Sequence, residues 1–200
     1  MKEALSKSER TRQLIIEKTA PVFNMKGYAG TSMSDLTEAT GLTKGSIYGN
    51  FKDKEEVALE AFRHNAKIRK NAIATEINAA QTYTEKLMVL TRMFHSSNIR
   101  IFPKGGCPLI NTGAEADDTH EELRKAVSAE LLQWKKDIST IIKKGISAGE
   151  FRHDVVIEKF ALSVIALVEG GIFIAGSTKN PAFLDTVLQT IKDMIHSISV

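Results

Sequence analysis

The residues best suited to chemistry lie near the N-terminus, between positions 31 and 51. Ile47 and Phe51 are four residues apart and should face a core, so the remaining surface of one short helix is polar. The side chains left on that surface are Lys44, Ser46, Tyr48 and Asn50. Lysine and tyrosine can hold phosphates, whereas lysine, serine and asparagine can reach base edges. Such a surface is typical of a helix that lies in the major groove of DNA.

Capping signals predict two helices joined by a sharp turn. Ser32 and Asp35 form a capping box that opens a helix over 33–40, and Gly41 ends it in a left-handed conformation. Thr43 then caps a second helix over 44–51. Together these elements predict a helix-turn-helix whose second helix reads DNA. The expected DNA-contacting residues are Thr31, Ser32, Thr43, Lys44, Gly45, Ser46, Tyr48, Asn50 and Lys52.

This stretch and its flanks resemble the TetR family of transcriptional regulators, in its AcrR-like form. The resemblance covers roughly residues 12–62 and rests on the GYAGTS turn, the run DLTEATGLTKGSIY and the exit FKDKEE. Farther on, the segment KGGCPLIN resembles one seen in some members. Gly49 and Asn50 depart from the commoner pattern, in which a larger side chain and a histidine are usual. These departures concern which DNA sequence is read.

The resemblance implies a helix-turn-helix DNA-binding domain of three helices over 1–52, followed by a helical effector-binding and dimerisation domain over 53–200. It also implies a function: a repressor that binds a palindromic operator as a homodimer and is released by a small-molecule effector. Two other classes stay open on the residues alone, an enzyme and a helical ligand-binding module without DNA-dependent function.

Capping signals and apolar stripes predict helices along the whole chain, and no strand alternation is present, so the expected fold is all-α. The first helix opens at Ser6, with a kink or break near 17–21 because Pro21 removes the bond to the Glu17 carbonyl. Later helices are expected to open at Asp53, Thr82 or Thr84, Thr119, Asp154 and Asn180, and Pro108 restarts a short apolar segment. The helix from Asp53 carries Arg63, Lys67 and Lys70, on a face that is either solvated or close to DNA.

The last two helices offer more apolar surface than one chain of this length easily covers. A second copy would cover that surface, and a two-fold dimer matches half-sites about one DNA turn apart. The predicted interface residues are Ile165, Ile172, Leu184, Leu188, Ile191 and Ile195. The alternative is a monomer in which these helices are central.

An effector pocket follows from the resemblance and from the methionine and phenylalanine side chains of the central helices. The candidates are Met88, Phe94, Phe102, Cys107, Asn111, Glu115, Glu169 and Phe173. The apolar candidates could equally be ordinary core. Glu115 and Glu169 are more telling, because a carboxylate in apolar surroundings needs a reason. Cys107 is either a redox-sensing thiol, a ligand contact or a small packed side chain.

Composition excludes several classes of protein. A single cysteine rules out an intrachain disulfide, and the first ten residues lack the apolar core of a signal peptide, so we expect a cytoplasmic protein. The apolar run over 160–176 is interrupted by Ser163 and Glu169, which favours a buried helix over a membrane span.

Charge and histidine placement add little to the functional prediction. The net charge is only +3, although residues 1–54 carry nine Lys and Arg against six Asp and Glu. Five scattered histidines share no ligand spacing, so neither a metal nor another cofactor is expected. The order Lys44-Gly45-Ser46 does not match a phosphate-binding loop.

Overall fold

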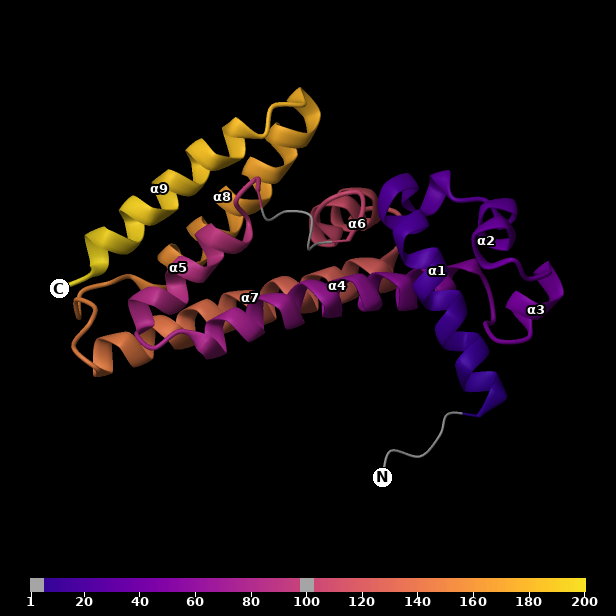
Figure 1. Ribbon diagram of the computed structural model, residues 1–200, viewed down its shortest axis with the longest axis horizontal. Helices are drawn as coiled ribbons and strands as arrows, with labels where there is room; N and C mark the ends of the chain where they lie inside the picture. The colour runs from indigo at the N-terminus through magenta and orange to yellow at the C-terminus, as the bar shows by residue number, and fades with distance from the viewer. Residues whose placement is uncertain (1–5, 98–102) are drawn as a thin grey trace. The chain divides into compact units, whose positions relative to one another are not determined.

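The structure is a computed structural model that describes residues 6–97 and 103–200, and this part of the chain is all-α (Figure 1). Its nine helices are α1 Lys7–Gly30, α2 Met33–Thr40, α3 Lys44–Tyr48, α4 Lys54–Ala79, α5 Tyr83–Met93, α6 Pro108–Ala116, α7 Glu121–Ser147, α8 Ile157–Thr178 and α9 Ala182–Ile198. The predicted fold class is confirmed. The described residues contain no strand beyond one isolated bridge pair, Phe151 with Ser199.

The chain divides into two compact units, each assembled from two stretches. The first unit comprises Met1–Ile68 and Pro103–Val127, and the second comprises Arg69–Phe102 and Ser128–Val200. The helices α4 and α7 therefore contribute residues to both units. This division follows packing, whereas the predicted boundary after residue 52 concerns function and stays a prediction.

The first unit packs α2, α3, α6 and the beginning of α4 around α1. Its core is apolar and contains Ile15, Ala20, Phe23, Leu36, Ile47, Phe51, Val57 and Ala61. Ile47 and Phe51 are both buried in it, as their spacing predicts. Buried apolar side chains from four helices thus hold the short α2 and α3, which are too short to be stable alone.

The course of α1 differs from the expectation for Pro21. Helical backbone runs through Pro21, and the only non-helical residue within α1 is Gly27, with φ of +72°. Proline deprives the helix of one hydrogen bond, but tertiary packing of Ala20 and Phe23 on either side keeps the turn helical. The break occurs instead at glycine, which adopts a left-handed conformation without a steric penalty.

The second helix of the predicted pair is shorter than expected. It ends at Tyr48 rather than at position 51, and Gly49 forms its C-cap. The Asn50 N–H then bonds to the Ile47 carbonyl at 3.0 Å, which tightens the last turn. Glycine is a poor helix former, and this explains the early end.

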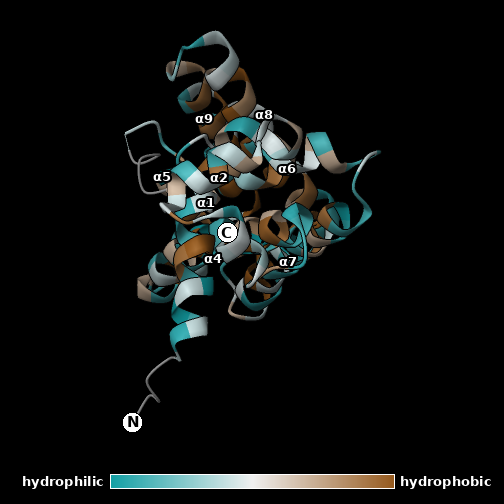
Figure 2. Cartoon of the chain, turned by 90° about the vertical axis from the view of Figure 1, so that its right-hand side faces the viewer, coloured by the Kyte–Doolittle hydropathy of each residue, from teal (hydrophilic) through white to brown (hydrophobic). Residues whose placement is uncertain are grey.

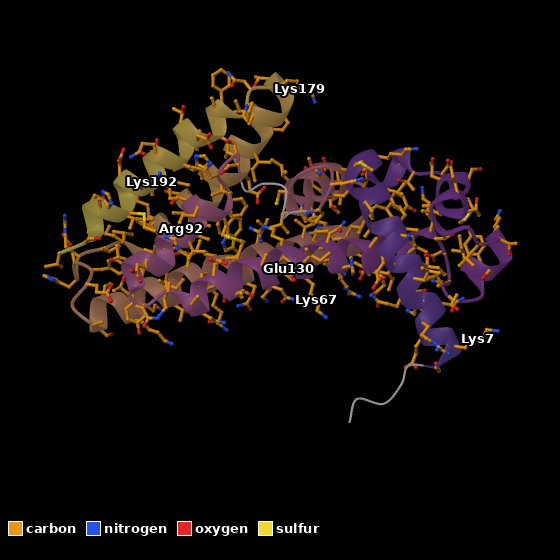
Figure 3. All side chains as sticks on the ribbon, in the orientation of Figure 1. Lys7, Lys67, Arg92, Glu130, Lys179 and Lys192 are labelled. Atoms are coloured by element: carbon orange, nitrogen blue, oxygen red, sulfur yellow. The ribbon has the colours of Figure 1, made fainter. Side chains whose placement is uncertain are left out.

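The second unit is organised by the paired helices α8 and α9, with α5 packed against α9 (Figure 1). Lys179, labelled in Figure 3, forms the left-handed C-cap of α8, and the Asn180 side chain accepts a bond from the Ala182 N–H at the start of α9. That helix start is as predicted. Both helices are rich in apolar residues (Figure 2).

Among the described residues, α8 is the one helix long and apolar enough to cross a membrane. One such helix is weak evidence, because the core helix of a soluble protein passes the same test. Seven of its residues are buried within this chain, Glu169 among them. Since 33% of its most apolar window is buried within this chain, packing inside one chain accounts for part of its composition.

Two predicted helix starts are wrong. Thr119 does not cap α7, because its hydroxyl donates to the Glu115 carbonyl and the helix begins at Glu121. Asp154 does not open α8, because its carboxylate accepts two bonds from Arg152, at 2.7 and 3.0 Å. The α8 helix begins three residues later, without a side-chain cap. In both cases the side chain that was expected to cap the helix is hydrogen-bonded to another residue.

Candidate functional site

The helix-turn-helix is built by the capping interactions that the sequence predicts. The Ser32 hydroxyl accepts from the Asp35 N–H at 3.2 Å, and the Asp35 carboxylate accepts from the Ser32 N–H at 2.7 Å. Gly41 has φ of +69°, and the Thr43 hydroxyl accepts from the Ser46 N–H. These bonds satisfy the free N–H groups of both helices and fix the turn between them.

An exposed polar and cationic face results on α3 and just after it. The Lys44 ammonium lies 5.7 Å from the centre of the Tyr48 ring, and Tyr48 is 41% exposed. The Lys52 side chain is 87% exposed, and its ammonium lies 3.8 Å from the Asp53 carboxylate, so this ion pair is open to solvent and an anion can reach the lysine. A lysine, a phenol and a second lysine on one short segment form the charge pattern that phosphate contact requires.

Arg12 fixes the chain where α3 gives way to α4, and the sequence analysis missed it. Its guanidinium donates to the Asn50 carbonyl at 2.6 Å and to the Glu56 carboxylate at 2.7 Å, and it lies 4.0 Å from the centre of the Phe51 ring. The Lys52 N–H and then Arg12 hold the pKa of Glu56 below its usual value. Arg12 therefore determines how α3 is presented.

Lys54 is a second anchor outside the predicted set. Its ammonium donates to the carbonyls of Tyr28 and Thr31, at 2.8 and 3.0 Å, and lies 4.1 Å from the centre of the Tyr28 ring. It thus ties the first turn of α4 to the end of α1. No sequence pattern marks this role, because the carbonyls lie more than twenty residues away.

Two of the predicted DNA-contacting residues are occupied within the protein. Thr31 is 1% exposed, and its hydroxyl donates to the Gly27 carbonyl. The Asn50 amide donates to the Ser46 carbonyl at 2.9 Å and accepts from the Ser8 hydroxyl. We therefore expect both to position the backbone. Ser46 and Asn50 are half-buried, and the predicted residues that remain exposed on this surface are Ser32, Thr43, Lys44, Gly45, Tyr48 and Lys52.

The predicted ligand residues do not gather in one place. Asn111 and Glu115 belong to the first unit, where Asn111 bonds to the Gly105 and Asn24 carbonyls and Glu115 to the N–H groups of Tyr28 and Ala29. Cys107 is buried at the start of α6 in the same unit. For Asn111 and Glu115 these hydrogen bonds, and for Cys107 its burial, give each side chain a structural role within the first unit.

The other predicted ligand residues belong to the second unit or lie outside the described residues. Phe94 is buried against Trp134, Glu169 is buried near Arg69, and Met88 is half-buried on α5. Phe173 is 61% exposed on α8. Phe102 lies outside the residues that the structure describes.

A cavity of about 350 Å³ lies within the second unit, and none of the predicted ligand residues that the structure describes lines it. Its apolar walls come from α4, α5 and α7 and include Ile73, Ile77, Leu90, Ile138 and Ile141. Arg69 and Trp134 also line it, with Glu130, labelled in Figure 3, on α7. Cavities of this size hold small organic molecules.

Comparison with known proteins identifies the family. The model for bacterial regulatory proteins of the tetR family matches residues 15–61, and the model for the tetracyclin repressor-like C-terminal domain matches residues 83–191, which is more than half of the chain. The chain belongs to the TetR family. It is a DNA-binding transcriptional regulator, and regulators of this family are not enzymes.

Solved and curated TetR-family relatives cover nearly the whole chain. The crystal structure of a TetR-family transcriptional regulator from Cytophaga hutchinsonii is 55% identical over 99% of both chains, with a TM-score of 0.96. A TetR regulator from Chloroflexus aurantiacus is 32% identical over 98% of both chains, with a TM-score of 0.91. The transcriptional repressor DhaR from Mycobacterium sp. strain GP1 is 24% identical over 90% of this chain and 89% of its own.

The predicted interface residues of this TetR-family chain are mostly covered by the chain itself. Ile165 is buried, Ile172 is half-buried, and the α9 residues Leu184, Leu188, Ile191 and Ile195 are buried as well. Those four α9 side chains are at most 1% exposed, so a partner would have to contact other side chains of the same helices. The exposed apolar side chains of α8 and α9 are Leu162, Phe173, Ile174 and Phe183.

Within the described part of this TetR-family chain, no group of three or more His, Cys, Asp or Glu side chains could hold a metal ion.

Proposed function

We propose that this TetR-family regulator is a repressor that binds a palindromic operator as a homodimer and leaves it when a small molecule binds. The observation that carries the DNA-reading part is the capped α2–α3 pair, from which Lys44, Tyr48 and Lys52 project with exposed polar groups. Its place of action is the cytoplasm, where operator DNA is accessible.

The test of DNA reading begins with selection of bound DNA from a random pool. Tyr48→Phe and Lys52→Ala should weaken every selected site to a similar degree, and Lys52→Ala should lower the slope of log affinity against log salt by about one. Lys143→Ala removes an equal charge from an exposed position on α7 and should leave affinity unchanged. Unchanged affinity of the Tyr48→Phe/Lys52→Ala double variant at low salt would refute this interface.

Dimerisation is proposed through the exposed apolar side chains of α8 and α9. Leu162, Phe173 and Phe183 are each at least 45% exposed, and a row of large apolar groups on two neighbouring helices marks an interaction surface. A two-fold dimer would present two copies of α3 to two half-sites.

Sedimentation measures this proposal directly. Phe173→Glu should convert the dimer to monomer at micromolar concentration, because a carboxylate in an apolar interface must be desolvated. The control is Leu132→Glu, since Leu132 is 58% exposed on α7 and should leave the dimer intact. A Phe173→Glu variant that sediments as a dimer would refute this surface.

Effector release is proposed to act through the cavity in the second unit. The α4 helix starts at Lys54, directly after the reading segment, and its later residues Arg69 and Ile73 line the cavity. An allosteric coupling of about 1–3 kcal/mol would lower operator affinity roughly 5–150-fold. Coupling is reciprocal, so saturating operator must weaken the effector by the same factor; equal effector affinity with and without operator would exclude release.

A further inference from the structure

Arg69 is an unusual residue in the wall of the cavity. It is 4% exposed, yet its Nε and Nη2 atoms are buried without a hydrogen-bond partner. These two atoms form one edge of the guanidinium, with parallel N–H groups that match the two oxygens of a carboxylate. A buried charged donor without an acceptor is unfavourable, so a ligand that supplies an acceptor to this edge would be stabilised.

Glu169 balances the charge of Arg69 without meeting its hydrogen-bonding needs. The Glu169 Oε1 atom lies 3.9 Å from Nη2, which is beyond hydrogen-bond distance. Glu169 is not among the residues that line the cavity, whereas Arg69 is. A molecule in the cavity therefore meets the guanidinium of Arg69 and not the carboxylate of Glu169.

Trp134 holds the guanidinium in place and adds a donor of its own. The Arg69 guanidinium carbon lies 3.9 Å from the centre of the Trp134 ring, which in turn stacks on Phe94 at 5.8 Å. Stacking of this kind fixes the plane of the guanidinium. The Trp134 Nε1 atom is also buried without a hydrogen-bond partner.

We propose that the cavity binds an organic acid with an apolar body, whose carboxylate accepts from Arg69 Nε and Nη2. The apolar body would pack on the walls formed by Ile73, Leu90 and Ile138. This inference rests on the proposed function, in which the molecule in the cavity is the effector. The wall also carries two carboxylates, Glu130 and Asp137, so a cation is the competing ligand class; the buried, unpaired edge of Arg69 favours the acid.

Glu169 then has a specific consequence for affinity. Its carboxylate competes with that of the ligand for the same guanidinium, since both are negative and close to Nη2. Replacing Glu169 with glutamine should therefore strengthen the binding of an acid. If the cavity prefers cations, Glu169→Gln should instead weaken the binding of a cationic ligand.

The experiment uses the full chain and the fluorescence of Trp134, which is the single tryptophan of the sequence. The probes are octanoate and 4-phenylbutyrate, with octanol as the neutral control and octyltrimethylammonium as the cationic control. At least one acid should perturb the fluorescence saturably, with calorimetry giving the same affinity, and octanol and octyltrimethylammonium should bind at least about tenfold more weakly.

Variants then test the role of each residue. Arg69→Met should weaken the acid at least about tenfold, whereas Lys70→Met, which removes a neighbouring lysine of the cavity, should change its affinity less than about threefold. Glu169→Gln should tighten binding. If Arg69→Met fails to fold, the double variant Arg69→Met/Glu169→Met, which buries no unpaired charge, replaces it.

Three results would overturn the proposal: binding of neither acid, equal binding of octanol, or weaker acid binding by Glu169→Gln. All these measurements are made without DNA, so they do not depend on operator release. If the acid binds through Arg69 but does not release the operator, the ligand class stands and the proposed release falls.

Discussion

Glu115 on α6 accepts a 2.6 Å hydrogen bond from the backbone N–H of Tyr28, at the break near the end of α1. Its other oxygen accepts from the Ala29 N–H at 2.7 Å. The two N–H groups follow Gly27, whose left-handed backbone turns them out of the helix. Unpaired N–H groups at a half-buried helix break are unfavourable, so α6 completes the DNA-reading unit.

Alanine at Gly27 should destabilise the protein more than alanine at Gly41. Both glycines have positive φ, +72° and +69°, but ψ is 176° at Gly27 and 13° at Gly41. Alanine at Gly41 should cost about 1–2 kcal/mol of backbone strain, and alanine at Gly27 about 1–3 kcal/mol, because that φ/ψ region is open almost only to glycine. At Gly41 a new Cβ meets nothing within 4 Å, but at Gly27 it would lie 2.5 Å from the Glu115 Oε2 atom. Displacing that carboxylate should add about 1–3 kcal/mol, measured by denaturant unfolding.

Removing the carboxylate shows whether that added loss comes from Glu115. In a Glu115→Ala background, the difference in unfolding free energy between Gly27→Ala and Gly41→Ala should narrow, because the crowding atom is gone and only the difference in backbone strain remains. An unchanged gap between the two glycines would contradict the assignment.

Replacing Arg12 with methionine should loosen the junction between α3 and α4. The Asn50 carbonyl and the Glu56 carboxylate would both lose their donor. The expected loss is about 1–2 kcal/mol of unfolding free energy, since Arg12 and Glu56 are partly exposed and solvent screens their charges. Arg10→Met, two residues away at an exposed position, should have little effect; an equal loss there would argue against a specific role for Arg12.

The contribution of Asp35 should depend on pH in a defined direction. Its hydrogen bond with Lys26, followed by those with Ser32, holds the pKa of Asp35 far below its usual value near 3.8. A lowered folded-state pKa gives stability that is complete above the unfolded-state pKa and declines as the pH falls below it. Wild type should therefore be more stable than Asp35→Asn at pH 6, and thermal unfolding should show the difference shrinking below about pH 4.

The same pH series on Glu38→Gln, another carboxylate lost from α2, provides the control. A difference between wild type and Asp35→Asn that stays constant from pH 6 to pH 3 would contradict the role of the carboxylate charge.

Alanine should have opposite effects at two helical glycines of the second unit. At Gly145 on α7, a Cβ would overlap the buried Phe151 ring, and overpacking of this kind costs about 1–3 kcal/mol. At Gly170 on α8, a Cβ meets nothing within 4 Å, and removing a glycine from a helix should stabilise the chain by up to about 1 kcal/mol. Melting temperatures report both changes; stabilisation by Gly145→Ala would mean that Phe151 moves freely.

Local hydrogen bonds account for what the sequence predicted well. The box at Ser32–Asp35 and the left-handed Gly41 depend on residues within four positions of one another, so residue type and spacing suffice. Thr119 and Asp154 failed because each has a competing partner that uses the same polar group.

Contacts between residues far apart in the chain could not be predicted from the sequence. Arg12 with Glu56 and Glu115 with Tyr28 join positions more than forty residues apart, and neither pair disturbs a helical pattern. Arg69 was missed for another reason. It lies between Lys67 and Lys70, in a run of cations that is typical of a solvated surface, and only packing against Trp134 distinguishes it.

The discontinuous make-up of the first unit has a consequence for chimeric regulators. A graft that joins residues 1–52 to the remainder of a relative leaves the native α6 behind, together with Glu115. The transplanted DNA-reading segment would then contain the helix break at Gly27 but lack the carboxylate that accepts hydrogen bonds from the N–H groups following it. Exchange of specificity within the family should succeed when the recipient carries an acid at the corresponding place, or when both stretches, Met1–Ile68 and Pro103–Val127, are transferred together.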